Sequence, residues 1–262
     1  MTDDKDIKTS LNSYETISLD ELNGDSFMDR IEIKYLFPVN KIGELIRLMQ
    51  ENYKVLEIKQ TRALPYITTY LDTTDFFFYN QHIRGKLARY KIRHRRYEIN
   101  GDSFLEIKMK TNKGRTLKWR VENIYEPGVY NNNAEKLMDM YLTVESSLLN
   151  PSLTTRFNRI TMVGKKTDER LTIDYNINFT DPVTGSYTEM PYLGVIEMKK
   201  TGFSLRSQFN SLAKSLYIYP EGFSKYCTGN AILKPGLKTN MIKPKILLLK
   251  SIENEYIKSR RN

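Results

Sequence analysis

The sequence predicts an α+β domain, mainly antiparallel β, whose sheet curls so that a charged face lines a tunnel and helices pack outside. Seven segments alternate between apolar and charged residues, which is typical of half-buried strands. Two joints between them, Asn100-Gly101-Asp102 and Asn112-Lys113-Gly114, are hairpin signals because Asn and Gly accept positive φ. The charged faces carry Arg and Lys at alternate positions. Like charges on neighbouring strands repel, so we expect the sheet to enclose an anion.

The size and composition exclude several classes of protein. With 262 residues, 40% hydrophobic and 27% charged, the chain can form one large globular domain. No segment approaches the ~20 apolar residues of a membrane span, and the acidic start MTDDKDIKTS is no secretory signal. The single Cys227 and the two histidines, His82 and His94, exclude a disulfide framework and a Cys- or His-rich metal centre. We therefore expect a cytoplasmic protein, which a partner chain could attach to a membrane.

The net charge of +10 comes from one stretch of the chain. Residues 84–120 contain 13 Lys or Arg and 3 Asp or Glu, so the rest of the sequence balances to zero. A concentrated excess of this kind indicates a site for a concentrated anion more than a general affinity for nucleic acid.

The elements follow in order. Residues 1–27 are polar and aperiodic, so we expect a flexible leader. Alternation predicts a strand over 30–36, which Pro38 ends, and apolar residues at helical spacing predict a helix over 39–51. A strand over 66–71 precedes the turn residues of 72–75, and a meander of strands over 87–99, 103–110 and 115–124 follows.

The second half begins with a helix over 133–148 after an Asn-rich break. Alternation predicts strands over 153–163, 171–178 and 192–199, and helices are expected over 205–216 and 226–233. The folded domain is thus 28–233. The basic tail 234–262, with 8 basic and 2 acidic residues, could guide a polyanion, touch an anionic membrane, or be disordered or loosely helical.

The strands divide into two faces. The charged face takes Glu32, Lys34, Arg89, Lys91, Arg93, Arg95, Glu106, Lys108, Lys110, Lys118, Arg120, Arg156, Asp174, Glu197 and Lys199. The apolar face takes residues such as Tyr35, Tyr90, Trp119 and Phe157, and His94 falls with them. Because the Arg fork matches phosphate oxygens, a phosphate chain is the anion that this face best suits.

Eight segments, in order, resemble the polyphosphate polymerase (VTC) domain of the triphosphate tunnel metalloenzymes, which include the CYTH proteins. They are RIEIKYL, YLDTTD, RYKIRHRRY, FLEIKMK, LKWRV, TRFNR, VIEMK and FSKYC, running from about Arg30 to Asn230. The resemblance implies an eight-stranded closed tunnel barrel. It also implies transfer of the γ-phosphoryl group of ATP to a growing polyphosphate chain, with Mn²⁺ or Mg²⁺.

The resemblance and the face assignment together suggest roles. The catalytic clamp would be Arg93, Arg95, Lys108, Lys118, Arg120 and Arg156. Substrate contacts would come from Lys34, Arg89, Lys91, Lys110, Lys199, Ser224 and Lys225, and the metal ligands would be Glu197 and Glu32. Arg30 stands where the wider superfamily has the first glutamate of ExExK, which favours the polymerase branch and leaves fewer metal ligands.

Alternatives remain open on the sequence alone. A tunnel triphosphatase or polyphosphatase, or a non-catalytic polyphosphate binder, would share the tunnel. A nucleic-acid-binding sheet would interleave aromatics with Arg on one face, and only Tyr97 does so clearly. Glu32 and Glu106 could be ion-pair partners alone, Lys110, Lys199 and Arg159 could be rim charges, and Asp72 fits a turn or helix cap. The expected partners are therefore ATP or another nucleoside triphosphate and inorganic polyphosphate, not nucleic acid, with membrane or regulatory functions on a separate chain.

Overall fold

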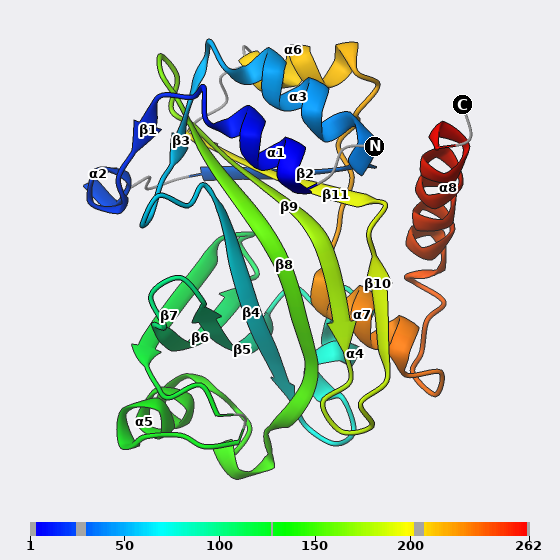
Figure 1. Ribbon diagram of the computed structural model, residues 1–262. Coiled ribbons are helices and arrows are strands. Elements are labelled where there is room, and N and C mark those ends of the chain that lie inside the picture. Colours follow the sequence, from blue (N-terminus) through cyan, green and yellow to red (C-terminus); the bar gives the residue numbers. More distant parts are fainter. Residues whose placement is uncertain (1–3, 25–29, 127, 202–206, 261–262) are drawn as a thin grey trace.

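The computed structural model describes residues 4–24, 30–126, 128–201 and 207–260 (Figure 1). The helices are α1 (Asp4–Leu11), α2 (Leu19–Gly24), α3 (Ile42–Met49), α4 (Phe77–Ile83), α5 (Asn132–Tyr141), α6 (Gln208–Ser215), α7 (Lys225–Leu233) and α8 (Lys243–Ser259). Two 3₁₀ turns cover Val39–Lys41 and Ser146–Leu148. The strands are β1 (Thr16–Ile17), β2 (Arg30–Pro38), β3 (Tyr53–Leu56), β4 (Ala63–Asp72), β5 (Arg89–Tyr97), β6 (Ser103–Lys110), β7 (Thr116–Glu122), β8 (Asn150–Gly164), β9 (Glu169–Thr180), β10 (Tyr187–Met190) and β11 (Leu193–Thr201).

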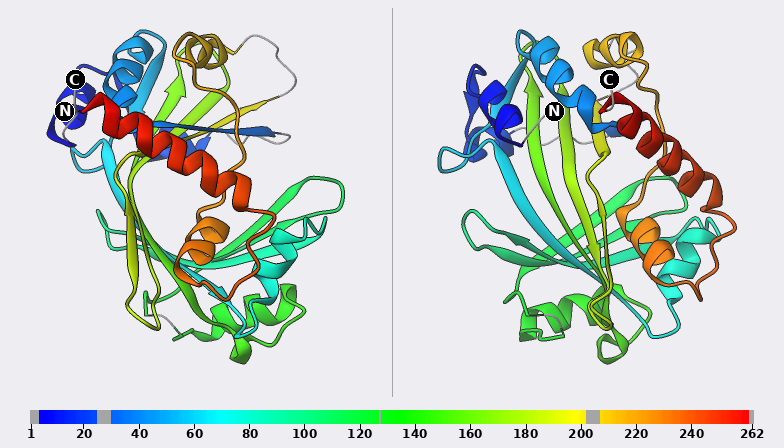
Figure 2. Two further views of the ribbon diagram at one scale, coloured as in Figure 1. Left: turned by 90° about the vertical axis from the view of Figure 1, so that its right-hand side faces the viewer. Right: turned by 45° about the vertical axis from the view of Figure 1, so that its right-hand side comes forward.

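The main sheet has eight strands in the order β2-β11-β9-β8-β4-β5-β6-β7, and neighbours along this path are antiparallel. The predicted α+β fold and its β5–β6–β7 meander are confirmed. No ladder joins β7 to β2 among the described residues. The sheet nevertheless curls strongly (Figure 2), so that Lys108 of β6 lies within electrostatic reach of Glu197 of β11, although four strands separate β6 from β11 along the path. We call the inner side the concave face and the outer side the convex face.

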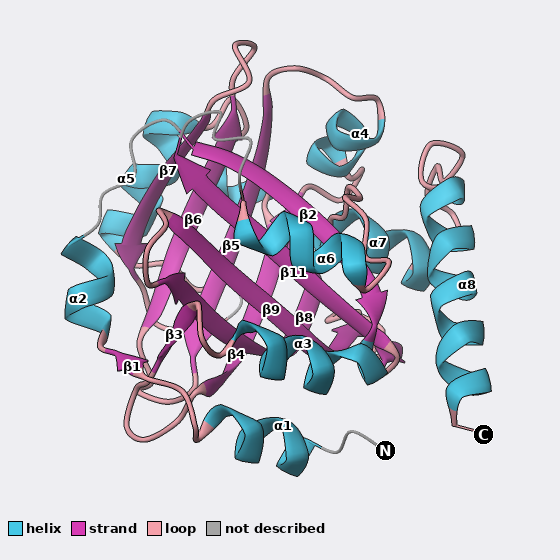
Figure 3. Ribbon diagram, turned by 90° about the horizontal axis from the view of Figure 1, so that it is seen from above, coloured by secondary structure: helices cyan, strands magenta, loops and turns pink. Residues whose placement is uncertain are grey.

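Helices cover the convex face in two places. Over β2, β8, β9 and β11, a core row of Ile160, Ile173, Ile196 and Tyr35 packs under α1, α3 and α6; Figure 3 shows α3 and α6 above these strands. Over β5–β7, a second core includes Ile92, Ile107 and the α5 residues Ala134 and Met138. Trp119 stacks on Tyr141 of α5 at 4.0 Å between ring centroids. The apolar faces therefore point outward under helices, as the alternation predicts.

Helix α7 is an exception, because it lies on the concave side of the sheet (Figure 2). Its Gly229 approaches β8 and β9 so closely that a Cβ would meet Leu153 at 2.6 Å and Phe179 at 2.9 Å. Tyr226 and Cys227, on the same helix, join these residues in an apolar cluster. One end of the concave face is thus filled by a helix, and the charged residues occupy the rest.

The two ends of the chain are more ordered than the sequence suggests. Ile7 and Leu11, one helical turn apart, are buried, as is Tyr14, whose hydroxyl donates to the carbonyl of Ile46. The expectation of a flexible leader is therefore wrong for the described part of residues 1–27. In the basic tail, α8 buries Leu249 and Ile252, so this segment is a packed helix. None of the described helices is long and apolar enough to cross a membrane.

Candidate functional site

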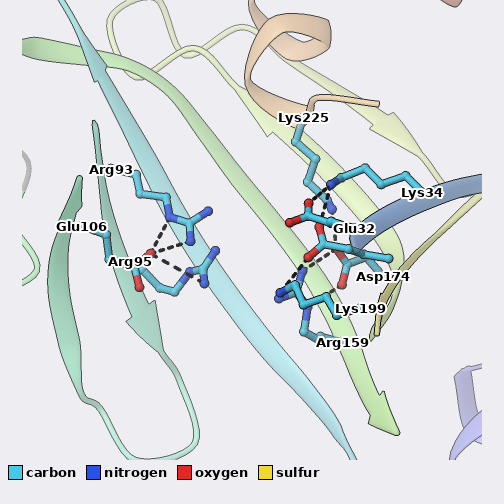
Figure 4. Close-up of polar contacts among 10 residues, drawn as sticks. Glu32, Lys34, Arg93, Arg95, Glu106, Arg159, Asp174, Lys199 and Lys225 are labelled. Carbon is cyan, nitrogen blue, oxygen red and sulfur yellow. Dashed lines mark hydrogen bonds and ion pairs between the residues drawn. The ribbon is translucent and has the colours of Figure 1, made fainter. Parts of the chain in front are cut away.

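The strand register places most of the predicted residues on the concave face. Directly paired residues share a face, and three rows cross β5, β6 and β7. These rows are Arg89–Lys110–Thr116, Lys91–Lys108–Lys118 and Arg93–Glu106–Arg120. On the opposite side of the concave face, Glu32 and Lys34 of β2 pair with Lys199 and Glu197 of β11. Two walls of charged side chains thus face each other (Figure 4).

On the first wall, Glu106 is a fully buried carboxylate among three cations. Arg93 donates to Oε2 through Nε at 2.6 Å, and the Nη1 of Arg95 lies 3.8 Å from the same oxygen. The Nζ of Lys118 lies 2.6 Å from Oε1. Burial opposes ionisation, but these cations hold the pKa of Glu106 well below its usual range. Glu106 is therefore charged and acts as the counter-ion of a basic cluster.

On the second wall, Glu197 lies between two lysines. Its Oε2 is 2.8 Å from Nζ of Lys34, and its Oε1 is 2.8 Å from Nζ of Lys199. Lys34 also contacts Glu32. Burial opposes the charge of Glu197, but Lys199 and Lys34 hold the pKa of its carboxyl well below the usual range. The two predicted metal ligands are thus brought together, with Lys34 between them.

A third group joins the sheet to α7. Asp174 of β9 accepts two hydrogen bonds from Arg159, at 2.6 and 2.7 Å, and also contacts Nζ of Lys225. Although burial opposes its ionisation, Arg159 and Lys225 lower the pKa of Asp174 to about 2. Ser224 caps α7 by accepting from the backbone N–H of Cys227, and Lys91 of β5 donates to the same hydroxyl at 3.2 Å. Ser224 and Lys225, which are predicted to contact the substrate, therefore both lie on the concave face.

Aromatic rings form a floor beneath the cations. Tyr66 and Phe157, paired across β4 and β8, stack with centroids 5.5 Å apart. The guanidinium of Arg159 lies 5.1 Å from the Tyr66 centroid, that of Arg95 lies 5.6 Å from it, and Nζ of Lys225 lies 4.5 Å from the Phe157 centroid. Cation–π contacts hold a cation in place without neutralising it, so the two rings help to position these cations beside their carboxylate partners.

Lys108 shows the electrostatic conflict on this face. Its ammonium lies near the positive charges of Arg93, Arg95 and Lys199, and Glu197 on the facing wall attracts it. The charge of Arg93, followed by burial, holds the pKa of Lys108 well below its usual range. The surroundings therefore disfavour the positive charge of Lys108, which a bound polyanion would stabilise.

One predicted site residue lies elsewhere. Arg156 pairs with Ile67 of β4, which pairs in turn with Arg96 of β5, and both arginines are exposed on the convex face. The assignment of Arg156 to the charged lumen is thus wrong, and Phe157 faces inward in its place. For Arg159, the sequence allows either a tunnel residue or a rim charge. In the structure it is the inward-facing arginine of β8.

The alternation of residues along β8 already indicates that Arg159 faces inward. Ile160 and Met162 are convex-face core residues of the same parity as Arg156, so strict alternation puts Arg159 with Thr161 on the other face. The prediction from the sequence misses this pattern because it assigns the aromatic Phe157 to the outward, apolar face. Asp174, assigned to the charged face without a function, is the partner that Arg159 requires.

His94 and Asp72, for which the sequence suggests structural roles, make hydrogen bonds with the protein's own backbone and side chains. His94 is fully buried on the convex side, and its Nε2 lies 3.3 Å from the carbonyl of Asn123. Asp72 accepts from the N–H groups of Phe78 and Tyr79 at the start of α4 and from the hydroxyl of Tyr226. The side chain of Arg30 lies outside the described part of the chain.

The described side chains contain no group of three or more His, Cys, Asp or Glu that could hold a metal ion. Glu197 and Glu32 supply the hard oxygen donors that Mg²⁺ and Mn²⁺ prefer, but both are engaged by Lys34. This pair fits a metal only if substrate oxygens and water complete the coordination. The donor set is therefore compatible with an ion that arrives together with a phosphate chain.

Three solved structures are similar to this one. A candidate adenylyl cyclase from Hippeastrum, described as having a dominant triphosphatase activity, has a TM-score of 0.50 and 13% identity, covering 82% of this chain and 99% of its own. Candidate adenylate cyclases from Bacillus halodurans and Vibrio parahaemolyticus have TM-scores of 0.47 and 0.46 and identities of 17% and 10%. They cover 75% and 77% of this chain, and 96% and 97% of their own. At 13% identity, the likeness to the Hippeastrum protein concerns the fold alone.

The curated proteins gave no match to the sequence. The sequence profile of the VTC domain, in contrast, matches residues 29–234. This range is most of the chain and contains every concave-face residue named above. The chain therefore belongs to the VTC domain family.

Proposed function

We propose that this protein is a polyphosphate polymerase that transfers the γ-phosphoryl group of ATP to a growing inorganic polyphosphate chain. The observation that carries the proposal is the charge conflict at Lys108, a half-buried lysine that lies between Lys91 and Lys118 in one row of the sheet. Arg93, Arg95 and Lys199 add further positive charge around it. A phosphate chain would supply the negative charge that this face lacks. Membership of the VTC domain family supports the same substrate class.

The first wall is suited to clamping the triphosphate. Arg93 and Arg95 are nine-tenths buried and flank Glu106, with Lys118 on its other side. Arg forks bind phosphate oxygens in bidentate fashion, and phosphoryl transfer needs positioning and neutralisation of these oxygens more than covalent help. Lys108 and Arg120, in adjacent rows, would extend the clamp along the chain.

The second wall is suited to the metal and the acceptor. Glu197, with Glu32, would hold Mn²⁺ or Mg²⁺, which would neutralise charge on non-bridging phosphate oxygens when bound. Lys34 and Lys199 fix the Glu197 carboxylate from two sides. Lys225 and Arg159 would bind the acceptor chain next to them, since both lie over the aromatic floor.

Transfer to phosphate needs no general base. The terminal oxygen of the acceptor chain is already ionised; it attacks the γ-phosphorus, the bond to the β,γ-bridging oxygen breaks, and ADP leaves. Among the described residues of the concave face, the carboxylates of Glu106, Asp174 and Glu197 all accept from cations. These carboxylates are held as counter-ions and are not poised to activate water, which favours transfer over hydrolysis.

The test is incubation of the purified protein with ATP and Mn²⁺ or Mg²⁺, with chromatography of nucleotide and phosphate products. The proposal expects ADP and long-chain polyphosphate with little free phosphate. Free phosphate without chains would favour a tunnel hydrolase, and tight tripolyphosphate binding without turnover would favour a polyanion receptor. We expect the enzyme to work in the cytoplasm, with any membrane or regulatory function on a separate chain.

A variant of the metal ligand sharpens this test. Glu197→Gln removes the negative charge but keeps the side-chain shape, so tripolyphosphate binding should persist while turnover is lost. Turnover equal to that of the parent would show that Glu197 is not a metal ligand. The same assay on Arg96→Ala, an exposed convex-face change, controls for general damage.

A further inference from the structure

A cavity of about 360 Å³ lies where β6 begins and β7 ends. Its wall includes Phe104 of β6, Glu122 of β7, Asp102 of the turn between β5 and β6, and Ile124 and Asn131 beyond β7. Small-molecule sites are commonly of this size or larger. The cavity has no part in the phosphate clamp described above.

The cavity adjoins the clamp through Phe104. This residue pairs with Arg95 of β5 on one side and with Glu122 of β7 on the other, so it belongs to the concave face. The guanidinium of Arg120 lies 4.9 Å from the centroid of its ring. Glu106, at the centre of the basic cluster, follows two residues later, which is roughly 7 Å along a strand.

The charge of the cavity differs from that of the clamp. Asp102 and Glu122 contribute carboxylates to its wall, and its lining contains no Lys or Arg. Phosphate would be repelled here, whereas carboxylates accept from the hydroxyls of a sugar. Phe104 is only half buried, and an aromatic ring of this kind can stack on a flat base.

We propose that this cavity binds the nucleoside part of the triphosphate donor. The inference rests on the proposed function, because it assigns the other end of the same substrate. With the base against Phe104, the phosphates would extend along β6 past Arg120 and Glu106 towards Lys108 and the facing Glu197. The cavity would distinguish a nucleoside triphosphate from inorganic phosphate chains, which have no group to place there.

The test compares two ligands on matched variants. Binding of ATP and of inorganic tripolyphosphate is measured by calorimetry for Phe104→Ala, Phe104→Trp, Ile124→Ala and the control Leu117→Ala, an exposed convex-face residue of β7. Stacking on an aromatic side chain is worth about 1–3 kcal/mol, so Phe104→Ala should weaken ATP binding by roughly 5- to 150-fold and leave tripolyphosphate unchanged. Phe104→Trp should retain ATP affinity, and the exposed Ile124→Ala should weaken ATP binding less than Phe104→Ala does.

Other outcomes separate this inference from the proposed function. If the parent binds both ligands and Phe104→Ala weakens them equally, the ring only supports Arg120 and the inference is wrong. If neither Phe104→Ala nor Ile124→Ala changes ATP binding, the nucleoside lies elsewhere and the inference is also wrong. A parent protein that binds neither ligand would overturn the proposed function itself.

Discussion

The two walls of the concave face use charge in different ways. On the β5–β7 wall, one buried carboxylate, Glu106, serves Arg93, Arg95 and Lys118 together. On the β2–β11–β9–β8 wall, carboxylates alternate with cations: Glu197 lies between two lysines, and Asp174 between Arg159 and Lys225. The first wall therefore has unused positive charge, whereas the second is closer to neutral.

This difference assigns different tasks to the walls. A cation that shares its counter-ion retains donors and charge for a ligand, so the first wall should provide affinity for phosphate. A cation in a dedicated ion pair has a fixed position, so the second wall should provide geometry. Buried charges are tolerated only when paired or hydrogen-bonded, which explains why even the first wall retains Glu106.

The largest expected effect comes from removing the shared counter-ion of the first wall. Glu106→Gln keeps the shape but leaves Arg93, Arg95 and Lys118 with no carboxylate between them. Breaking a buried charge pair on one side costs about 3–5 kcal/mol. We expect the free energy of unfolding, measured with urea at neutral pH, to fall by this amount, and tripolyphosphate to restore much of the loss.

Two comparisons make that result specific. Glu98→Gln, an exposed carboxylate after β5, should leave unfolding unchanged. Because the pKa of Glu106 lies well below its usual range in the folded state, its contribution is present above the pKa of an ordinary Glu and is lost as the pH falls through the lowered folded value. A Glu106→Gln protein as stable as the parent at neutral pH would contradict the shared counter-ion.

The next largest effect tests which arginines face the ligand. Arg95→Ala should weaken tripolyphosphate binding by about 10- to 100-fold, since a hydrogen bond to a charged group contributes roughly 1.5–3 kcal/mol. Its neighbour Arg96 points to the convex face, so Arg96→Ala should bind as the parent does. Arg159→Ala and Arg156→Ala form the equivalent pair on β8. A loss for Arg96→Ala or Arg156→Ala as large as for its neighbour would reverse the face assignment.

These pairs also show what the sequence could predict. Alternation identified the strands and faces of β2, β5, β6, β7, β9 and β11, because each has several apolar residues of one parity packed under helices. It failed at Arg156, where the inward Phe157 belongs to an aromatic floor. Burial of Phe157 beneath Arg159 and Lys225 depends on β4 and α7, which are distant in sequence. A local pattern cannot contain that contact.

The same limit applies to the chain ends and to α7. The leader has few apolar residues, yet Ile7 and Leu11 pack on a surface formed by α3 and the sheet. Helix α7 was expected from its residues, but its insertion into the concave side depends on the close approach of Gly229 to Leu153 and Phe179. Elements with their own periodicity could be predicted, whereas their docking required the tertiary structure.

A smaller effect concerns the uptake of protons by Lys108 when tripolyphosphate binds. The pKa of Lys108 is held well below its usual range by Arg93 and by burial, and a phosphate chain would raise it. Tripolyphosphate binding at alkaline pH, between the lowered and the restored value, should therefore take up protons. Calorimetry in buffers of different ionisation enthalpy measures this uptake, and Lys108→Met should reduce it. Binding of tripolyphosphate without proton uptake across the alkaline range would contradict the conflict at Lys108.

The smallest effect tests the floor on which both walls rest. Tyr66 lies under Arg95 of the first wall and Arg159 of the second. Tyr66→Leu removes both cation–π contacts, each worth about 0.5–2 kcal/mol, so tripolyphosphate affinity should fall severalfold. Tyr66→Phe keeps the ring and should keep the affinity, which separates stacking from a role of the hydroxyl. If Leu and Phe variants of equal thermal stability bind equally well, the ion pair to Asp174 alone positions Arg159, and the walls act independently.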